Sequence, residues 1–441
     1  MDPNKRSLRV GVAGLGTVGQ ALLAEFAKHG DSIQKRVGCE ISLTHVASRT
    51  PKPQVNLHGA SFSTDLNSLL NDDIDVVVEL IGYSNPDSNP EADPAFSLIK
   101  SAILKGKHVI TGNKAVIALH GNELFPLAVD SDVRIGYEAA VAGGIRIINT
   151  LQDLDDVNVD SITGILNGTC NYILTGMSEG ADYQTVLAKA QDEGFAEQVP
   201  DMDTKGIDTA QKLAILTYLA FNVDIESEKI PVEGIEEVHP SDLKYATQLG
   251  YQIRLLGISR IQNDIIDARV HLSLIPESVK LASISGVNNA ITITQNGTEI
   301  DHLEGEGAGG VPTASSVLLD LERLAGGDLQ PPTLPSSSRP YLGIENVLCP
   351  HYLCIEAEKE ACDMKAIRSA FLKENVGIQH LSEMSDDQVV NVDGKLIVPI
   401  VVLTEDATEP AITKVVNDLS QVGNSISSVR RIRVLDGVSP S

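Results

Sequence analysis

The residues best suited to chemistry lie between positions 194 and 216, where an acidic turn leads into a predicted helix. Glu197 and Asp203 stand in the turn, and Asp208 and Lys212 are four positions apart at the start of the helix. Residues with this spacing project from one helical face. Carboxylates suit the ammonium group of a small zwitterionic substrate, and a lysine can donate a proton to an alkoxide. The segment therefore predicts proton-transfer chemistry on a small, amino-acid-like molecule.

A plainer interpretation of the same spacing is an ordinary surface ion pair. Such a pair contributes only about 0.2–0.5 kcal/mol, and an isolated Asp-x-x-x-Lys is more often of this kind. Apolar residues behind the pair, among them Leu213, Leu216 and Leu219, would anchor the helix in either case. The remaining motifs of the chain decide between the two interpretations.

A glycine-rich turn near the N-terminus predicts dinucleotide binding. The turn Gly14-Leu15-Gly16-Thr17-Val18-Gly19 follows the apolar run Leu8–Val12 and opens a predicted helix over Gln20–Lys28. Glycines here allow a tight turn, close approach of a pyrophosphate, and close packing of helix on strand. The N-terminus of the helix then stabilises the phosphate charge.

The end of the second predicted strand bears on the choice of nucleotide. Arg49 follows the strand Ile41–Ala47, with Ser48 and Lys52 close by. An NAD-binding domain would carry Asp or Glu at this place to hold the ribose hydroxyls, whereas an arginine suits the 2′-phosphate of NADP(H). We therefore expect NADP(H) as the preferred cofactor and NAD(H) as the second choice. The alternative is a solvated surface arginine.

The elements around these motifs alternate between strand and helix up to about residue 136. Short apolar strands that alternate with helices are typical of a parallel, doubly wound sheet of the Rossmann type in an α/β protein. Ligands bind at the carboxyl ends of such strands. The predicted strands are Leu8–Val12, Ile41–Ala47, Asp75–Ile81 and His108–Thr111, and the predicted helices are Gln20–Lys28 and Pro94–Lys105.

From about residue 137 the pattern changes to an α+β type with a mixed or antiparallel sheet. Two-faced strands such as Arg269–Ile275 and Ala290–Thr294 indicate it, and Pro312–Leu324 is a predicted amphipathic helix. Residues 325–344 are rich in Gly, Pro and Ser in their first part and predict a linker. Beyond it the order is βαββαβ, the ferredoxin-like split pattern of an independent unit. Its predicted elements are His351–Glu356, Met364–Glu374, Ile378–Met384, Lys395–Leu403, Glu409–Val422 and Ser428–Leu435.

Composition excludes several classes of protein. The 441 residues are too many for one core and indicate two or three domains. A net charge of −26 argues against nucleic acid or an anionic membrane as a partner and leaves a small molecule. Five scattered cysteines, no signal peptide and no apolar run of about 18 residues indicate a cytoplasmic protein without a membrane span.

Residues 194–212 closely resemble the catalytic signature of homoserine dehydrogenases. That signature reads Gly-(Tyr/Phe)-(Ala/Thr)-Glu-x-Asp-Pro, followed by Asp-x-x-Gly-x-Asp-x-x-x-Lys. Every fixed position matches except Val199, where the family usually has Asp. The resemblance extends over nearly all of residues 8–330. Further matching blocks are Asn113-Lys114-Ala115, Glu138–Ile145, Asn167–Tyr172 and Gly305–Thr313.

The resemblance implies NAD(P)-dependent interconversion of L-homoserine and L-aspartate 4-semialdehyde, a step of threonine and methionine biosynthesis. It implies that Lys212 donates a proton to the developing alkoxide, that Asp208 orients Lys212, and that Lys114 assists. Glu197, Asp203 and Asp208 would bind the substrate. Two alternatives remain at this point: a reductase of another amino-acid aldehyde, and a catalytically silent amino-acid sensor.

The resemblance also implies residues for the cofactor and for an ion. The cofactor-binding residues would be Gly14, Leu15, Gly16, Thr17, Val18, Gly19, Arg49, Lys114, Gly194 and Gly309. In the family a hinge segment holds a sodium ion through backbone carbonyls, here those of Glu138, Val141, Gly143 and Ile145. A plain structural turn is the alternative. The chain departs from the family at Arg146 and Glu306, where proline is usual.

The family pattern finally implies the domain plan and assembly. The expected units are a dinucleotide-binding domain over 1–136 with about 307–330, a catalytic and dimerisation domain over 137–306, a linker over 325–344, and an ACT-like regulatory domain over 345–441. A homodimer or homotetramer is expected. ACT domains that bind amino acids often have a Gly in their first turn, but Glu358–Asp363 has none. We therefore expect a role in assembly and weak or absent inhibition by threonine.

Overall fold

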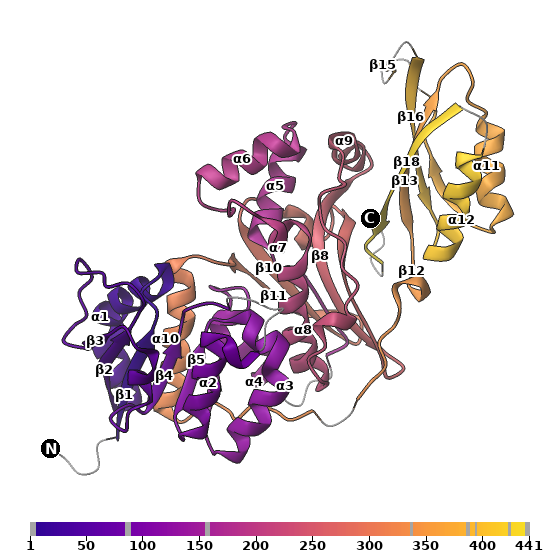
Figure 1. The fold of residues 1–441 in the computed structure, drawn as a ribbon. Coiled ribbons are helices and arrows are strands. Elements are labelled where there is room, and N and C mark those ends of the chain that lie inside the picture. The colour runs from indigo at the N-terminus through magenta and orange to yellow at the C-terminus, as the bar shows by residue number, and fades with distance from the viewer. Residues whose placement is uncertain are drawn as a thin grey trace.

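The computed structural model describes residues 6–83, 90–154, 159–335, 338–384, 389–392, 395–421 and 425–436. Figure 1 shows three regions in a row: an N-terminal sheet with its helices, a central sheet, and a C-terminal module at the far end. Residues 336–337 of the expected linker and the last residue of the helix expected over 409–422 lie outside the described parts. No helix in those parts is long and apolar enough to span a membrane.

The N-terminal sheet is parallel, with the strand order β3-β2-β1-β4-β5-β6. Alternate residues of the strand over 76–79 face opposite sides of the sheet. Val77 packs with the helices over 94–104 and 114–130, whereas Val76 and Val78 pack with those over 17–37 and 310–326. The predicted doubly wound sheet is therefore confirmed. Its strands are β1 (Arg6–Ala13), β2 (Cys39–Ala47), β3 (Ser61–Ser63), β4 (Val76–Glu79), β5 (His108–Thr111) and β6 (Ile135–Gly136). Its helices are α1 (Thr17–Val37), α2 (Pro94–Leu104) and α3 (Lys114–Asp130).

The chain leaves this sheet for the central region and later returns to it. Helix α10 (Gly310–Gly326) packs beside α1 although the whole central region lies between the two helices in the sequence (Figure 1). Its buried Val317 and Leu321 belong to the same core cluster as Leu22 of α1. The cleft between the two regions is thus bordered by the start of α10 as well as by the first sheet.

The strands of the central region form an antiparallel sheet covered by helices, one of the two kinds of sheet that the change of pattern predicts. Helix α8 lies on this sheet, and its residues 213–216 are almost fully buried. The strands are β7 (Ser161–Ile165), β8 (Tyr251–Gln262), β9 (Ile265–Pro276), β10 (Asn288–Gln295) and β11 (Thr298–Glu306). The helices are α4 (Ile147–Asp153), α5 (Gly168–Ser178), α6 (Tyr183–Asp192), α7 (Asp201–Thr204), α8 (Ile207–Phe221) and α9 (Pro240–Gln248).

The C-terminal module has the strand order β18-β13-β16-β14, all antiparallel, with two helices. This is the order of a ferredoxin-like βαββαβ unit. The six predicted elements are present as β13 (His351–Glu358), α11 (Met364–Lys373), β14 (Ile378–Leu381), β16 (Lys395–Thr404), α12 (Glu409–Ser420) and β18 (Ile426–Val434). The sequence did not predict the short strands β12 (Leu348–Cys349), β15 (Val390–Val392) and β17 (Ala407–Thr408).

The module has a core of its own, but it also pairs with the central region, which the linker composition did not predict. Strand β18 pairs in parallel with β9, where Arg433 lies opposite Ser273 and Val434 opposite Leu274, so that one sheet runs through both. The linker is bound as well, because the Tyr218 hydroxyl donates to Thr333 O at 2.6 Å. A linker's composition describes only how two units are connected, and it does not reveal which strand edges meet.

Candidate active site

Asp208 and Lys212 form a buried pair at the start of α8. Asp208 is 4% exposed and Lys212 is 8% exposed, with Lys212 Nζ 2.8 Å from Asp208 Oδ2. Lys212 Nζ also donates to Leu166 O at 2.8 Å. Gly206 precedes the helix at φ +80°, and a Cβ there would lie 2.9 Å from Val232. The pair is therefore no surface ion pair: the helix start and the carbonyl hold it in one geometry.

Lys114 reaches the same carboxylate from the first sheet. It opens α3 directly after β5, and its Nζ lies 3.0 Å from Asp208 Oδ1. The helix N-cap is Asn113, whose Oδ1 accepts from Val116 N at 3.2 Å. Asp208 thus joins a lysine of the N-terminal region to a lysine of the central region, and Lys114 stays 36% exposed to the cleft.

The charges of this cluster are strongly coupled. Burial alone would raise the pKa of Asp208, but the ammonium groups of Lys212 and Lys114 and the amide of Asn167 outweigh it, so that the pKa lies well below its usual range. The Asp208 charge in turn raises the pKa of Lys114, against its burial. Burial and the charge of Asp208 raise the pKa of Asp203. The site therefore carries an ionised Asp208 between two lysines.

Asn167 joins the two aspartates. Its Nδ2 donates to Asp203 Oδ1 at 2.7 Å and to Asp208 Oδ2 at 2.9 Å, while its Oδ1 accepts from Cys170 N at 2.8 Å and caps α5. Asn167 therefore caps α5 and orients both aspartates, although it does not itself line the cavity described next.

A cavity of about 490 Å³ opens beside this cluster, between the first sheet and the central region. Such a volume accommodates a small substrate together with part of a cofactor. Glu197 is exposed and lines the cavity together with Asp203, Asp208 and Lys114. Its remaining walls include Val18, Leu80, Tyr83, Asn113, Val199, Pro200, Met202, Gln211 and Thr313.

Two polar residues of this cavity were missed by sequence reasoning. Glu79 ends β4, is fully buried, and accepts from Thr111 Oγ1 at 2.6 Å and Ile81 N at 2.7 Å. Burial raises the pKa of its carboxyl. An acidic residue at the end of an otherwise apolar strand was the available signal. Gln211 is 6% exposed, and among the described residues its Oε1 has no hydrogen-bond partner.

The glycine-rich turn has the shape that a dinucleotide requires. Gly14 has φ +105°, and a Cβ on it would lie 2.6 Å from Leu80 O. A Cβ on Gly19 would lie 2.1 Å from Gly14 O, which explains the close packing of helix on turn. A Cβ on Gly16 would meet nothing within 4 Å, so this glycine faces open space. These are the three roles expected of the motif.

The other expected cofactor residues lie at different distances from the turn. Arg49 is exposed just beyond β2, whose Ala47 accepts from Gly14 N at 2.8 Å. Gly309 precedes α10 at φ +122°, and a Cβ on the next residue would lie 3.1 Å from Thr17 Cγ2, so this loop borders the turn. Gly194 is exposed after α6 and does not line the cavity.

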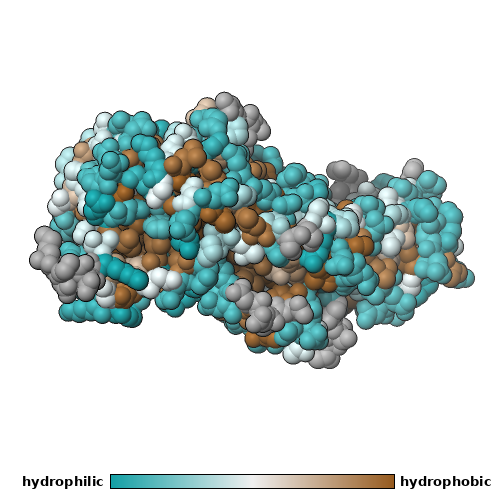
Figure 2. All heavy atoms as spheres, turned by 90° about the horizontal axis from the view of Figure 1, so that it is seen from below, coloured by the Kyte–Doolittle hydropathy of each residue, from teal (hydrophilic) through white to brown (hydrophobic). Residues whose placement is uncertain are grey.

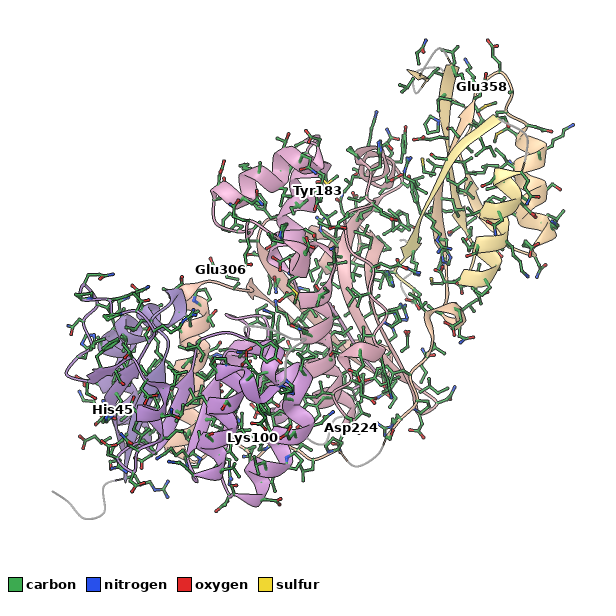
Figure 3. The ribbon with its side chains drawn as sticks, viewed as in Figure 1. His45, Lys100, Tyr183, Asp224, Glu306 and Glu358 are labelled. Atoms are coloured by element: carbon green, nitrogen blue, oxygen red, sulfur yellow. The ribbon has the colours of Figure 1, made fainter. Side chains whose placement is uncertain are left out.

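Glu306 lies at the end of β11, where the chain passes to α10 (Figure 3). Its carbonyl accepts from Gly144 N at 2.9 Å, which joins this passage to the segment expected to hold sodium. Its side chain is exposed.

The segment 138–145 fits a sodium ion only in part. Of the expected carbonyls, that of Gly143 already accepts from Ser316 Oγ at 2.5 Å, and that of Ile145 accepts from Ile147 N at 2.9 Å. Each carbonyl has one further lone pair, so the segment offers fewer free oxygens than the resemblance implies.

The side chain of Glu138 has a structural role. It accepts from Ile148 N and Asn149 N at 2.9 Å each and thereby caps α4. Its backbone N–H donates to Asp320 Oδ2 at 3.0 Å. Burial raises the pKa of Glu138 to about 7. Val141 is fully buried in the same turn.

Fold and site together define an NAD(P)-dependent oxidoreductase. A doubly wound sheet carries the dinucleotide turn, and Lys114 and Asp208 line a cavity at its carboxyl edge. Asp208 also binds Lys212, which does not itself line the cavity. Family models described as "Homoserine dehydrogenase, NAD binding domain" and "Homoserine dehydrogenase" match residues 14–138 and 147–321. The chain belongs to the homoserine dehydrogenase family, enzymes of amino-acid biosynthesis.

Full-length relatives support this assignment. A homoserine dehydrogenase of Pseudomonas aeruginosa is 34% identical over 444 residues, which cover 97% of this chain and 99% of that protein. The crystal structure of a homoserine dehydrogenase from Thiobacillus denitrificans is similar with a TM-score of 0.87 and 33% identity, over 98% of this chain and 99% of that one. A hyperthermophilic archaeal homoserine dehydrogenase in complex with NADPH is similar over 72% of this chain and 97% of that one, with a TM-score of 0.60 and 25% identity.

Proposed function

We propose that this chain interconverts L-homoserine and L-aspartate 4-semialdehyde with Lys212 as the proton donor to the developing alkoxide. The observation that carries this assignment is the shared carboxylate: Asp208 holds Lys212 at 2.8 Å and Lys114 at 3.0 Å beside the cavity. The cofactor supplies hydride transfer when bound. The chain's part is to place the substrate and to move one proton.

We assign the substrate ammonium to Glu197 and Asp203. Asp208 contributes its charge, but its two oxygens already accept from two lysines and Asn167. Lys114 is more exposed than Lys212, and we assign it to positioning the reacting oxygen and to sharing the proton transfer. Rates with homoserine and with other amino-acid alcohols of different length test the substrate: a faster rate with another alcohol would contradict the proposal.

Glu197→Gln is expected to raise KM for homoserine about tenfold, because it removes a charge that pairs with the ammonium. The kcat should change much less, because Glu197 makes no contact with Lys212 in the described structure. Steady-state kinetics measure both constants. Asp192→Asn is a suitable control, since Asp192 is exposed nearby and outside the cavity wall. A fall in kcat with unchanged KM would contradict this role.

For the cofactor we propose a preference for NADP(H) over NAD(H). Arg49 at the end of β2 and the absence of an acid between residues 45 and 52 support it, and one of the similar structures is a complex with NADPH. Arg49→Ala is expected to raise KM for NADPH about tenfold and KM for NADH by less than twofold, because only NADPH carries the 2′-phosphate. Equal changes for the two cofactors would show that Arg49 does not contact that phosphate.

The glycine-rich turn 14–19 and Gly309 would then hold the pyrophosphate side, with Lys114 at the nicotinamide. Gly194 is a weaker candidate because it lies outside the cavity wall. We assign no step to a sodium ion, since two of the four expected carbonyls already accept hydrogen bonds within the chain. The free thiols of all five cysteines suit a cytoplasmic enzyme.

We propose that residues 345–441 form an ACT-like module, that 1–136 with 307–330 bind the cofactor, and that 137–306 carry catalysis and assembly. The ferredoxin-like strand order supports the first assignment. Figure 2 shows hydrophobic residues in the middle of one face, and others among hydrophilic residues elsewhere on that face. Such an area suits contact with a second copy, so we expect a homodimer or homotetramer.

L-Threonine is expected to inhibit the full-length enzyme weakly or not at all, because the first turn of the module, Glu358–Asp363, contains no glycine for a close approach of backbone to ligand. Rates over a range of threonine concentrations measure inhibition, and light scattering measures mass. Strong inhibition, or a monomer, would contradict these assignments. Truncation is a poor test, because it would uncover β9 and leave Arg269, 2% exposed, without Asp436.

A further inference from the structure

The last strand of the C-terminal module, β18, carries an arginine that contacts the central region. Arg433 is 5% exposed and donates to both oxygens of Glu233, at 2.6 and 2.9 Å. A two-pronged contact of this kind fixes distance and orientation together. The backbones are bound as well: Arg433 lies opposite Ser273 in the β18–β9 pairing, and Glu233 N donates to Val270 O of β9 at 2.8 Å.

Glu233 belongs to residues 231–238, which we call the coupling loop. This loop contacts Thr204 through three of its residues. Ile235 N donates to Thr204 O at 2.8 Å, and Glu236 Oε1 accepts from Thr204 Oγ1 at 3.1 Å. A Cβ on Gly234 would lie 2.2 Å from Thr204 O, so loop and helix backbone touch without a side chain between them. The loop cannot move without Thr204.

Thr204 follows Asp203 directly at the end of α7. The carbonyl of Asp203 accepts from Cys170 Sγ at 3.1 Å and from Gly206 N at 2.9 Å, and its carboxylate accepts from Asn167 beside the cavity. Asp203 therefore has the active site on one side and Thr204 with the coupling loop on the other. A shift of the loop would therefore reach the backbone of Asp203 through Thr204.

We propose that Glu233 and Arg433 are positioning residues through which the C-terminal module places Asp203 for substrate binding. This inference rests on the proposed role of Asp203 toward the substrate ammonium. Lys212 is held separately, by Asp208 and by Leu166 O. Loss of the contact therefore weakens binding of homoserine and leaves proton transfer nearly intact.

Glu233 is the better of the two residues to change. Its side chain is 51% exposed and borders a cavity of about 720 Å³ between the coupling loop and the module. Removing the Glu233 carboxylate does not leave the buried charge of Arg433 unpaired, because Arg433 Nε also lies 2.7 Å from Glu409 Oε1. Glu237 is the matched control: it is an exposed glutamate of the same loop and the same cavity wall, with no ion pair in the described structure.

Glu233→Ala is expected to raise KM for homoserine about tenfold, with kcat changed less than about twofold and KM for the cofactor unchanged. Glu237→Ala is expected to behave as the wild type. Arg433→Lys keeps the positive charge but cannot form the two parallel hydrogen bonds to Glu233, so this variant should also raise KM for homoserine. The double variant should then resemble the stronger single variant, because both changes remove one contact.

An unchanged KM for homoserine in Glu233→Ala, equal changes in Glu237→Ala, or additive effects in the double variant would each overturn the inference. So would a parallel loss of cofactor affinity, which indicates general loosening. The Asp203→Asn variant distinguishes the role of Asp203 in substrate binding from the connection of Asp203 to the C-terminal module. If it leaves KM for homoserine unchanged, the role of Asp203 fails and the inference with it. If it raises KM while Glu233→Ala does not, only the connection to the module fails.

Discussion

Replacing Lys212 by alanine should lower kcat by about 10²–10⁴, the range for loss of a positioned acid or base. The physical reason is the placement of its ammonium group, which Asp208 Oδ2 and Leu166 O hold at 2.8 Å each. No other described lysine is held in this way beside the cavity, and Lys114 contacts the other oxygen of Asp208, Oδ1. Rates of aldehyde reduction with saturating cofactor measure the effect. In the oxidation direction, also with saturating cofactor, KM for homoserine should change much less than kcat.

The chain contains its own control for this experiment. Asp201 and Lys205 have the same spacing as Asp208 and Lys212, and their charges are 2.5 Å apart, but both side chains are about half exposed. Lys205→Ala should therefore leave kcat unchanged. Lys212→Met fills the space of the lysine without a proton to donate, and it should be as slow as Lys212→Ala. Turnover near that of the wild type in both Lys212 variants would exclude Lys212 as the proton donor.

The two identical spacings show what sequence could and could not reveal about the site. Local pattern predicted helix α8 with its Asp208–Lys212 pair, because the two residues lie within one turn of helix. It did not predict the Asp201–Lys205 pair, which has the same spacing. Pattern alone did not distinguish the buried pair from the exposed one, since burial depends on the sheet that α8 covers. The resemblance to a family supplied that distinction, and the burial of Asp208 and Lys212 agrees with it.

Contacts between residues far apart in the chain explain most of what was missed. Glu233 and Arg433 are 200 positions apart, and each is an unremarkable charged residue in its own segment. The linker composition indicated a separate module, whereas the pairing of β18 with β9 depends on two strand edges that no local pattern marks. Glu79 is different, because the sequence alone shows an acidic residue within an apolar strand, and no role was predicted for it.

The parallel sheet was the most predictable part of the fold. Short apolar strands buried on both faces produce continuous runs such as residues 76–78, and glycines at 14 and 19 mark the turn that follows the first of the strands. The ferredoxin-like order of the module was predictable for a similar reason, because the spacing of its apolar residues differs between the strands and the helices. Short strands such as β12 and β17 have only two residues each, too few for a pattern.

Asp208→Asn should reduce kcat about 10²- to 10³-fold and also change its dependence on pH. The asparagine keeps the shape but removes the charge that Lys212 and Lys114 share. Two ammonium groups would then face each other across a neutral amide. The charge of Asp208 is the largest cause that raises the pKa of Lys114, and burial opposes it. Without that charge the pKa of Lys114 falls.

The sign of the pH effect follows from this shift. A lysine that must be protonated to assist reduction of the aldehyde loses its proton as pH rises through its pKa, so a lower pKa moves the alkaline loss of activity to lower pH. Profiles of kcat against pH for the wild type and Asp208→Asn measure the displacement. Asp201→Asn, which alters the exposed pair of the same spacing, should keep the wild-type profile. An unmoved alkaline limb in Asp208→Asn would mean that the alkaline loss of activity does not come from Lys114, and it would contradict this prediction.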